Sequence, residues 1–351
     1  MFFRFVTAPI DKYLASKRKQ NQQDAEAILQ KGLDELKQES KVIVNTNLIP
    51  NKNTFRPMTF DQYIGQEKAK TILKARIEGT KKMGVTFPHT LIYGKAGCGK
   101  TSLAKIIAKE LGVSFQEIIS TSIKEPKEIF KVIREANGGI IFLDEVHALK
   151  RELVEPLYPV MEDFRLGNDD LKPFTIIGAT TEIGEILENR RPFYDRFKRH
   201  QSLEDYTAGD IEKIAKQYTE KLFPNEKVDP IVFQVIGINS RYTPRIAIGL
   251  LESVIHMGGN YRLALRSEGI LLDGFTEQDL LVLEILTESP KGLGLQAIAS
   301  RLETSKKNFE YDIQPYLFKN GLITLTRSGR LITDKGKEMM KRMQEIKGNS
   351  I

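Results

Sequence analysis

Apolar positions in the central part of the chain fall into short runs separated by longer periodic segments. Runs without polar alternation predict strands at Leu91–Tyr93, Gly139–Leu143 and Phe174–Ala179. Helical spacing of apolar residues predicts helices over Lys100–Leu111 and Pro126–Glu135. Apolar strands separated by helices are typical of a parallel sheet that is covered on both faces. We therefore expect an α/β domain here.

The pattern changes twice after this domain. Asp210–Leu222, Pro230–Ile238 and Arg245–Met257 have helical periodicity with no strand between them, which predicts a small all-α domain. Further along, Thr276 can cap one helix, and two more are predicted at Leu293–Arg301 and from Ser305 toward Leu317. Two short strands then follow at Leu322–Leu325 and Leu331–Thr333. Three helices followed by a two-stranded wing is the order of a winged helix.

The N-terminal part looks like an extension. Asp24–Gln38 has apolar residues at helical spacing, which predicts an amphipathic helix that could dock on the core, on a partner or on a membrane surface. The charges of both signs on its polar face favour docking on protein. Ile43–Thr54 is polar and Asn-rich and predicts a linker. Met1–Ala8 is apolar, but charged residues follow too soon for a secretory signal.

Composition and charge narrow the class of protein. A chain of 351 residues with 40% apolar and 28% charged residues fits a soluble protein of two or three domains. The longest apolar runs have strand length, so we expect no membrane span. A single cysteine, Cys98, excludes an internal disulfide and a multi-cysteine zinc site. Of the net charge of +7, Arg301–Ile351 carries +5, which fits a polyanion-binding surface or, equally well, a solvated basic tail.

The sharpest motif is Gly94–Thr101, GKAGCGKT, which fits the P-loop pattern between a predicted strand and a predicted helix. Its glycines let backbone N–H groups face phosphate oxygens at a helix N-terminus. Lys100 would reach the β- and γ-phosphates, and the Thr101 hydroxyl would bind Mg²⁺. Cys98 is interpreted as a small loop filler rather than a nucleophile.

Acidic residues end the second predicted strand. Asp144 would hold Mg²⁺, mostly through water, and Glu145 would act as the general base on the attacking water. Alone, such a pair is more often a helix cap, but the upstream P-loop favours catalysis. The third strand ends in Thr180 and Thr181, either of which could orient that water, although a strand-end cap is the alternative.

Two arginines could complete this site. Arg196 could neutralise the γ-phosphate of a neighbouring subunit, and Arg245, at the start of a helix of the all-α domain, could reach the phosphates. In isolation each arginine is more often a surface ion-pair partner.

Together these motifs resemble the AAA+ ATPases, and more closely the RuvB family of Holliday-junction branch-migration motors. The resemblance covers about Phe55 to Met340. Besides the P-loop, it is carried by Phe55–Pro57, Tyr63–Gln66, Asp144–Leu149, Leu157–Phe164, Phe174–Thr181, Asp195–Phe197, Tyr206, Thr243–Arg245 and Gln314–Arg330.

The resemblance implies a set of site residues. Those implied to be catalytic are Lys100, Asp144, Glu145, Thr181 and Arg196, with Mg²⁺ at Thr101 and Asp144. Those implied to bind ATP are Phe55, Arg56, Ile64, Gly94, Gly97, Cys98, Gly99, Lys100, Thr101, Ser102, Glu162, Asp163, Phe164, Tyr206 and Arg245. Arg327 and Arg330 are implied to contact DNA phosphates.

The resemblance also implies an architecture and an activity. We expect an extension over residues 1–54, an α/β AAA+ ATPase domain over 55–205, a helical lid over 206–273 and a winged helix over 274–345. The implied protein is a cytoplasmic homo-oligomeric ring, expected to be a hexamer. It would hydrolyse ATP to move duplex DNA at four-way junctions in recombination and repair.

Two stretches depart from the family pattern. Only Arg165–Pro173 separates Phe164 from Phe174, where the family has a long β-hairpin that grips its partner RuvA. We therefore do not expect ordinary docking of a RuvA-like protein. The wing has Leu325 and Arg330 where the family usually has two arginines, so one phosphate contact is missing or moved.

Two other functions fit parts of the sequence. A nucleotide-dependent loader or replication-initiation factor would use the same ATPase domain as a switch, and the short hairpin and long extension favour it. A non-enzymatic regulator with a vestigial nucleotide fold is disfavoured by the intact set of Lys100, Thr101, Asp144 and Glu145.

Overall fold

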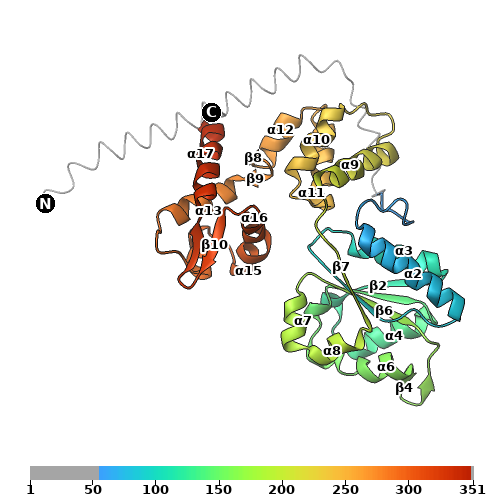
Figure 1. Ribbon diagram of the computed structural model, residues 1–351. Helices are drawn as coiled ribbons and strands as arrows, with labels where there is room; N and C mark the ends of the chain where they lie inside the picture. The colour runs from blue at the N-terminus through green and yellow to red at the C-terminus, as the bar shows by residue number, and fades with distance from the viewer. Residues whose placement is uncertain (1–54, 349–351) are drawn as a thin grey trace, which may run out of the picture. The chain divides into compact units, whose positions relative to one another are not determined.

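The computed structural model describes residues 55–348 (Figure 1). These residues belong to two compact units, one ending at Ile255 and the other beginning at His256. The predicted ATPase domain and the first helices of the predicted lid share the first unit, and the borders expected after residues 205 and 273 stay predictions. The predicted helix at Asp24–Gln38 and the linker after it lie outside the described residues.

A five-stranded parallel sheet forms the centre of the first unit, in the order β2-β3-β6-β1-β7 (Figure 1). Its strands are β1 (Thr90–Tyr93), β2 (Phe115–Ile119), β3 (Ile140–Asp144), β6 (Thr175–Thr180) and β7 (Arg199–Ser202). The three inner strands are those predicted from apolar runs, and they are almost fully buried. The two edge strands were not predicted because β7 is polar throughout and β2 mixes polar with apolar residues, and both are partly exposed.

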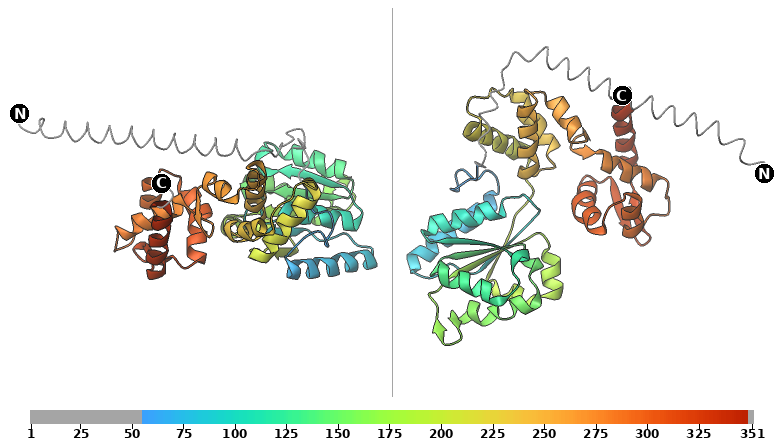
Figure 2. Two further views of the ribbon diagram at one scale, coloured as in Figure 1. Left: turned by 90° about the horizontal axis from the view of Figure 1, so that it is seen from above. Right: turned by 180° about the vertical axis from the view of Figure 1, so that it is seen from behind.

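Helices cover both faces of this sheet (Figure 2). They are α2 (Glu67–Met83), α3 (Lys100–Leu111), α4 (Pro126–Ala136), α5 (Arg151–Val154), α6 (Leu157–Asp163), α7 (Ile183–Asn189) and α8 (Arg191–Arg196). Leu91, Ile141 and Ile176 from the sheet pack in one buried cluster with residues of the five helices α4, α5, α6, α7 and α8. Since successive strand residues point to opposite faces, Ile92 and Phe142 face the other side, where α3 packs on β3 and β6.

One glycine in the central strand fixes how α8 ends. Gly178 lies opposite Leu91 and Leu143 in the neighbouring strands. A Cβ atom on Gly178 would lie 2.9 Å from the ring of Phe197, the buried residue directly after α8. The ring therefore occupies the space that a side chain on β6 would need, and it anchors the end of α8.

The segment between Phe164 and Phe174 forms a small hairpin. β4 (Arg165–Leu166) pairs with β5 (Asp169–Asp170) around a turn that contains Gly167. The hairpin thus has two residues in each strand, which is consistent with the short length expected from the sequence.

The predicted run of helices after the sheet is confirmed. It consists of α9 (Ala208–Leu222), α10 (Pro230–Asn239) and α11 (Pro244–His256). Thr207 caps α9 through two reciprocal hydrogen bonds with Asp210. The main-chain N–H of Asp210 donates to the Thr207 hydroxyl at 3.0 Å, and the main-chain N–H of Thr207 donates to the Asp210 carboxylate at 3.2 Å.

The second unit contains the predicted winged helix. Its elements are α12 (Tyr261–Ser267), β8 (Ile270–Leu272), β9 (Phe275–Thr276), α13 (Glu277–Thr287), α14 (Leu295–Arg301), α15 (Lys306–Asn308), η4 (Phe309–Ile313), α16 (Gln314–Lys319), β10 (Ile323–Thr326), β11 (Gly329–Ile332) and α17 (Asp334–Gly348). Strands β10 and β11 form the antiparallel wing. The third helix is divided, because Pro315 lacks an N–H group and a π-helical turn, η4, precedes it. The β8–β9 hairpin was not predicted.

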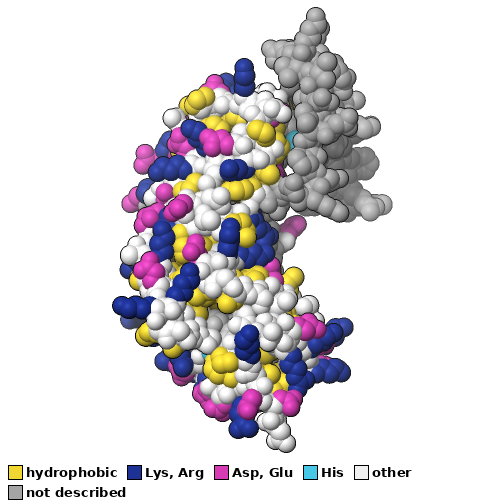
Figure 3. All heavy atoms as spheres, turned by 90° about the vertical axis from the view of Figure 1, so that its right-hand side faces the viewer, with side chains coloured by type: hydrophobic (Ala, Val, Ile, Leu, Met, Phe, Trp, Pro, Cys, Tyr) yellow, Lys and Arg dark blue, Asp and Glu magenta, His cyan; other side chains and the backbone are white. Residues whose placement is uncertain are grey.

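On the face drawn in Figure 3, basic side chains alternate with acidic ones and do not form a single patch. Among residues 55–348, none of the helices combines the length and the apolar character that crossing a bilayer requires.

Candidate active site

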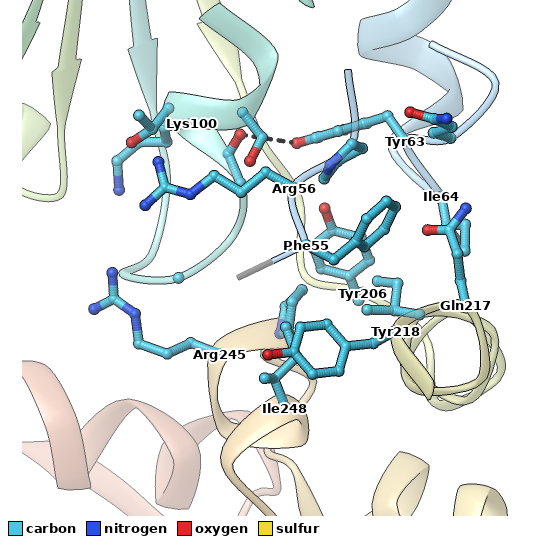
Figure 4. Close-up of a pocket in the computed structure, with 18 of the residues that line it drawn as sticks. Phe55, Arg56, Tyr63, Ile64, Lys100, Tyr206, Gln217, Tyr218, Arg245 and Ile248 are labelled. Atoms are coloured by element: carbon cyan, nitrogen blue, oxygen red, sulfur yellow. Dashed lines mark hydrogen bonds between the residues drawn. The ribbon is translucent and has the colours of Figure 1, made fainter. Parts of the chain in front are cut away.

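A cavity of about 350 Å³ lies where β1 and β3 end, between the P-loop and helices α9 and α11 (Figure 4). Its volume is within the range of about 300–1,000 Å³ typical of small-molecule sites. The predicted site residues that line it are Phe55, Arg56, Ile64, Gly97, Gly99, Lys100, Thr101, Ser102, Asp144, Glu145, Tyr206 and Arg245. Because the strands are parallel, the loop after β1 and the acidic end of β3 meet at one edge of the sheet.

The cavity has a basic side and an aromatic side. In Figure 4 the cationic groups of Lys100, Arg56 and Arg245 lie on the same side of the cavity, whereas the rings of Phe55 and Tyr206 lie further along it. This arrangement can accept a ligand with an anionic end and a flat apolar end.

The P-loop depends on glycine at two positions. Gly97 and Gly99 have φ of 73° and 94°, in the left-handed region that favours glycine. A Cβ on Gly97 would lie 2.8 Å from Cβ of Arg245, and one on Gly99 would lie 2.6 Å from the Tyr63 hydroxyl. The loop is therefore curled tightly against both α11 and the segment before α2.

Lys100 and Cys98 differ in what they offer a ligand. The Lys100 ammonium donates to the main-chain carbonyls of Gly94 (2.8 Å) and Lys95 (3.1 Å), so it bonds to neutral groups. Cys98 is buried, and its carbonyl accepts from the hydroxyl of Tyr206 (3.1 Å). Burial raises the pKa of the Cys98 thiol, and a protonated thiol is a poor nucleophile. This geometry supports the loop-filler interpretation.

The acidic pair has distinct environments. Burial and the charge of Glu145 raise the pKa of Asp144, against the effect of Lys100. Burial alone would raise the pKa of Glu145 as well. However, a hydrogen bond from His147, the charge of Lys100 and a hydrogen bond from Thr181 hold that pKa below its usual value. Glu145 is therefore the carboxylate that is more readily kept ionised, as a general base must be.

Glu145 also has an unusual backbone, with φ of 52°. Left-handed conformations of non-glycine residues concentrate at functional sites, because the surrounding structure has to hold them there. Here β3 on one side and the short helix η3 (Val146–Ala148) on the other fix the turn.

The sequence did not decide whether Thr180 or Thr181 could orient the attacking water, and the two side chains differ in their contacts. The Thr181 hydroxyl donates to Oε2 of Glu145 at 3.1 Å, and its N–H lies 3.4 Å from the same oxygen. Thr180 is buried, and its hydroxyl instead contacts His147 and the main-chain N–H of Glu182 at 3.0 Å each. Thr181 is thus the one beside the candidate base, although neither threonine lines the cavity.

Several predicted residues lie away from the cavity of their own chain. Gly94 and Cys98 belong to the loop but do not line the cavity, and neither do Arg196 and the stretch Glu162, Asp163 and Phe164. Oε1 of Glu162 lies 3.0 Å from Nε of Arg196. The Arg196 guanidinium also lies over the ring of Tyr158, 4.9 Å from its centroid. These groups form a separate cluster on α6 and α8.

The sequence did not indicate part of the cavity wall. Ile214, Gln217 and Tyr218 on α9 and Ile248 on α11 also line it. The three α9 residues follow the i, i+3, i+4 spacing of one helix face, which was the available signal. Tyr218 donates to Glu252 at 2.7 Å, and burial together with this contact raises its pKa.

In the second unit, the wing holds the predicted DNA contacts. Arg327 is exposed, and Arg330 donates from Nε to the side-chain carbonyl of Gln314 at 2.7 Å. Leu325 lies directly opposite Arg330 in the β10–β11 ladder and is 62% exposed.

Comparisons with known proteins agree on one family. Residues 55–203 match the Holliday junction DNA helicase RuvB P-loop domain, and residues 272–341 match the RuvB C-terminal winged helix domain. A Holliday junction branch migration complex subunit RuvB from Campylobacter fetus is 36% identical over 305 residues, 80% of this chain and 88% of the relative. Its counterpart from Nitratiruptor is 34% identical over 322 residues, 85% of this chain and 95% of the relative.

Solved structures give the same result. The Thermotoga maritima RuvB Holliday junction branch migration motor superimposes with a TM-score of 0.73 at 30% identity, covering 82% of this chain and 98% of that one. The Aeropyrum pernix ORC2 protein shares the fold alone, with a TM-score of 0.53 at 15% identity. The phosphate loop, the acidic strand end, the winged helix and these matches together lead to one conclusion: the chain belongs to the RuvB family of Holliday junction DNA helicases.

Proposed function

We propose that this protein is an ATP-driven DNA motor that moves duplex DNA at four-way junctions. The observation that carries the proposal is that the P-loop and the pair Asp144 and Glu145 line one cavity. ATP would bind with its phosphates toward Lys100 and its base toward Phe55 and Tyr206. The basic and aromatic sides of the cavity support this orientation.

The residues of the chain would share the chemistry of hydrolysis. Glu145 would accept a proton from the attacking water, and its lowered pKa keeps it ionised at neutral pH. Thr181 would fix Glu145 through the contact of 3.1 Å. Lys100 and the loop N–H groups would stabilise the charge that develops on the terminal phosphate.

A magnesium ion fits this site because the Thr101 hydroxyl and the Asp144 carboxylate both line the cavity and are the oxygen donors that Mg²⁺ prefers. When bound, Mg²⁺ would offset negative charge on the phosphates. Asp144 would meet it mostly through water.

We propose that Arg196 acts on the nucleotide of a neighbouring subunit. Its place on α8, outside the cavity of its own chain, supports this. An arginine that acts on the next subunit requires a head-to-tail interface, and by family analogy we expect this interface to close into a ring, with six subunits. Glu162, Asp163 and Phe164 would then approach the neighbour's nucleotide as part of the same surface.

The winged helix would hold DNA through its phosphates. Arg327 and Arg330 on the wing, with exposed Lys306 and Lys307 at the start of the third helix, can make phosphate contacts without reading bases. ATP hydrolysis would rotate the helical lid, which carries Arg245, relative to the P-loop. This rotation would move duplex DNA through the ring.

A loader or initiation factor remains a second candidate, favoured by the two-residue strands of the β4–β5 hairpin. With so short a hairpin we do not expect the family's usual docking of a RuvA-like partner. The deciding experiment incubates the protein and ATP with a mobile four-way junction. Branch migration supports the motor, whereas ATP turnover and DNA binding without movement support the loader.

A further inference from the structure

His147 lies between two carboxylates, and its hydrogen bond to Glu145 is one of the contacts that lower the pKa of that group. Its Nδ1 is 3.2 Å from Oε2 of Glu145, and its Nε2 is 3.3 Å from Oε1 of Glu182. Only 17% of the His147 side chain is exposed. The ring therefore connects the candidate base on one side to a second acid, at the start of α7, on the other.

Glu145 is held through one of its two oxygens. Oε2 faces His147 and accepts from the hydroxyl of Thr181. Among residues 55–348, no group bonds to Oε1, and the side chain lines the cavity. A carboxylate that is anchored by one oxygen leaves the other to take a proton from water.

Other contacts hold the His147 ring and its backbone. Its Nδ1 is 3.0 Å from the hydroxyl of Thr180, which is itself bonded to the N–H of Glu182. Nη1 of Arg190, the residue between α7 and α8, donates to the His147 carbonyl at 2.6 Å. The end of β6 and the start of α8 thus fix both the side chain and the main chain of His147.

We propose that His147 is a positioning residue for Glu145, and that Glu182 in turn holds His147. The ring keeps Oε2 of Glu145 turned toward Thr181, so that Oε1 faces the cavity. His147 does not itself line the cavity, so it acts through Glu145. This inference rests on the proposed role of Glu145 as the general base.

The test measures steady-state ATP hydrolysis together with the binding of a fluorescent ADP. His147→Ala should lower kcat about tenfold, the effect of losing one hydrogen bond to a charged group, with KM and ADP affinity unchanged. His147→Asn can place an amide N–H near the position of Nδ1 and should recover part of kcat. Glu182→Gln should lower kcat by a smaller factor, and Glu188→Gln, on the exposed side of α7, is the matched control.

A double variant shows whether His147 acts through Glu145. Glu145→Gln/His147→Ala should hydrolyse ATP no more slowly than Glu145→Gln, because no carboxylate is left to position. The inference is overturned if His147→Ala folds and keeps the wild-type kcat. If His147→Ala does not fold, Glu182→Gln takes its place, and a kcat equal to that of the Glu188→Gln control overturns the inference. A further tenfold loss in the double variant would also overturn it. Wild-type hydrolysis by Glu145→Gln alone would instead remove the proposed base itself.

Discussion

At the scale of single residues, Lys100 carries the phosphate-binding claim. Within the part of the chain that the structure describes, its ammonium bonds only to loop carbonyls, so it is available to phosphate oxygens. Lys100→Ala should therefore abolish ATP and ADP binding while leaving the thermal unfolding midpoint close to wild type. A fluorescent-nucleotide titration measures this, with Lys105→Ala on the same helix as the control. Retained affinity in Lys100→Ala would mean that phosphate binds elsewhere.

His89 predicts how stability depends on pH. It is buried beside the rings of Phe164 and Phe174, and its Nδ1 accepts from the N–H of Ile176 at 2.8 Å. Burial lowers its pKa from 6.5 to about 4. In the unfolded chain His89 takes up a proton near pH 6.5, whereas in the folded protein it does so only near pH 4. Stability contributed by neutral His89 is thus complete above pH 6.5 and falls as the pH is lowered toward 4, by up to about 3 kcal/mol.

Denaturant unfolding at about pH 7.5 and about pH 5 measures this dependence. His89→Gln should be less stable at the higher pH but should lose less stability between the two. His256→Gln, at an exposed histidine, should behave like wild type. An equal loss in His89→Gln and wild type would contradict the assignment.

At the scale of elements, Gly178 ties the central strand to α8. Gly178→Ala would press a methyl group against the Phe197 ring, which a Cβ would approach to 2.9 Å. We expect a loss of about 1–3 kcal/mol in unfolding free energy and reduced ATPase activity, because the end of α8 carries Arg196. Denaturant unfolding and an ATPase assay check this. Gly184→Ala on α7, where nothing lies within 4 Å of the new atom, should be neutral or stabilising.

The wing predicts that one substitution weakens DNA binding and that another strengthens it. Arg330→Ala should weaken DNA binding across sequences and reduce the slope of log affinity against log salt by about one unit. Leu325→Arg should strengthen binding and steepen that slope, because Leu325 is exposed and lies opposite Arg330. Salt titrations of binding to duplex DNA of unrelated sequences measure both effects. Unchanged slopes in both variants would move the DNA contact away from the wing.

The sequence could predict the inner strands and the phosphate loop because burial and backbone geometry leave few alternatives at those positions. Leu91–Tyr93 is apolar throughout since helices cover both faces, and the P-loop needs glycine where φ is positive. Edge strand β7, Arg199–Ser202, has no such pattern because solvent reaches it. Gln217 and Tyr218 were missed because many residue types can line a cavity from one helix face, so these positions leave no recognisable motif in the sequence.

At the scale of the whole molecule, the position of Arg196 predicts complementation between subunits. Arg196→Ala keeps Glu145, and Glu145→Gln keeps Arg196. Each variant alone should bind ATP but hydrolyse it poorly. In mixed rings, some nucleotides would meet an intact Glu145 from one subunit and an intact Arg196 from the next. An ATPase assay of the mixture should exceed both separate values, whereas activity equal to their average would argue that Arg196 acts within its own subunit.

The central claim is that a bound triphosphate is cleaved beside Glu145. Single-turnover hydrolysis of ATP by Glu145→Gln, with protein in excess over nucleotide, tests it most directly. We expect wild-type ATP affinity and a rate about 10²- to 10⁴-fold lower, because the amide cannot take the proton from water. Hydrolysis at the wild-type rate by a variant that still binds ATP would contradict the account.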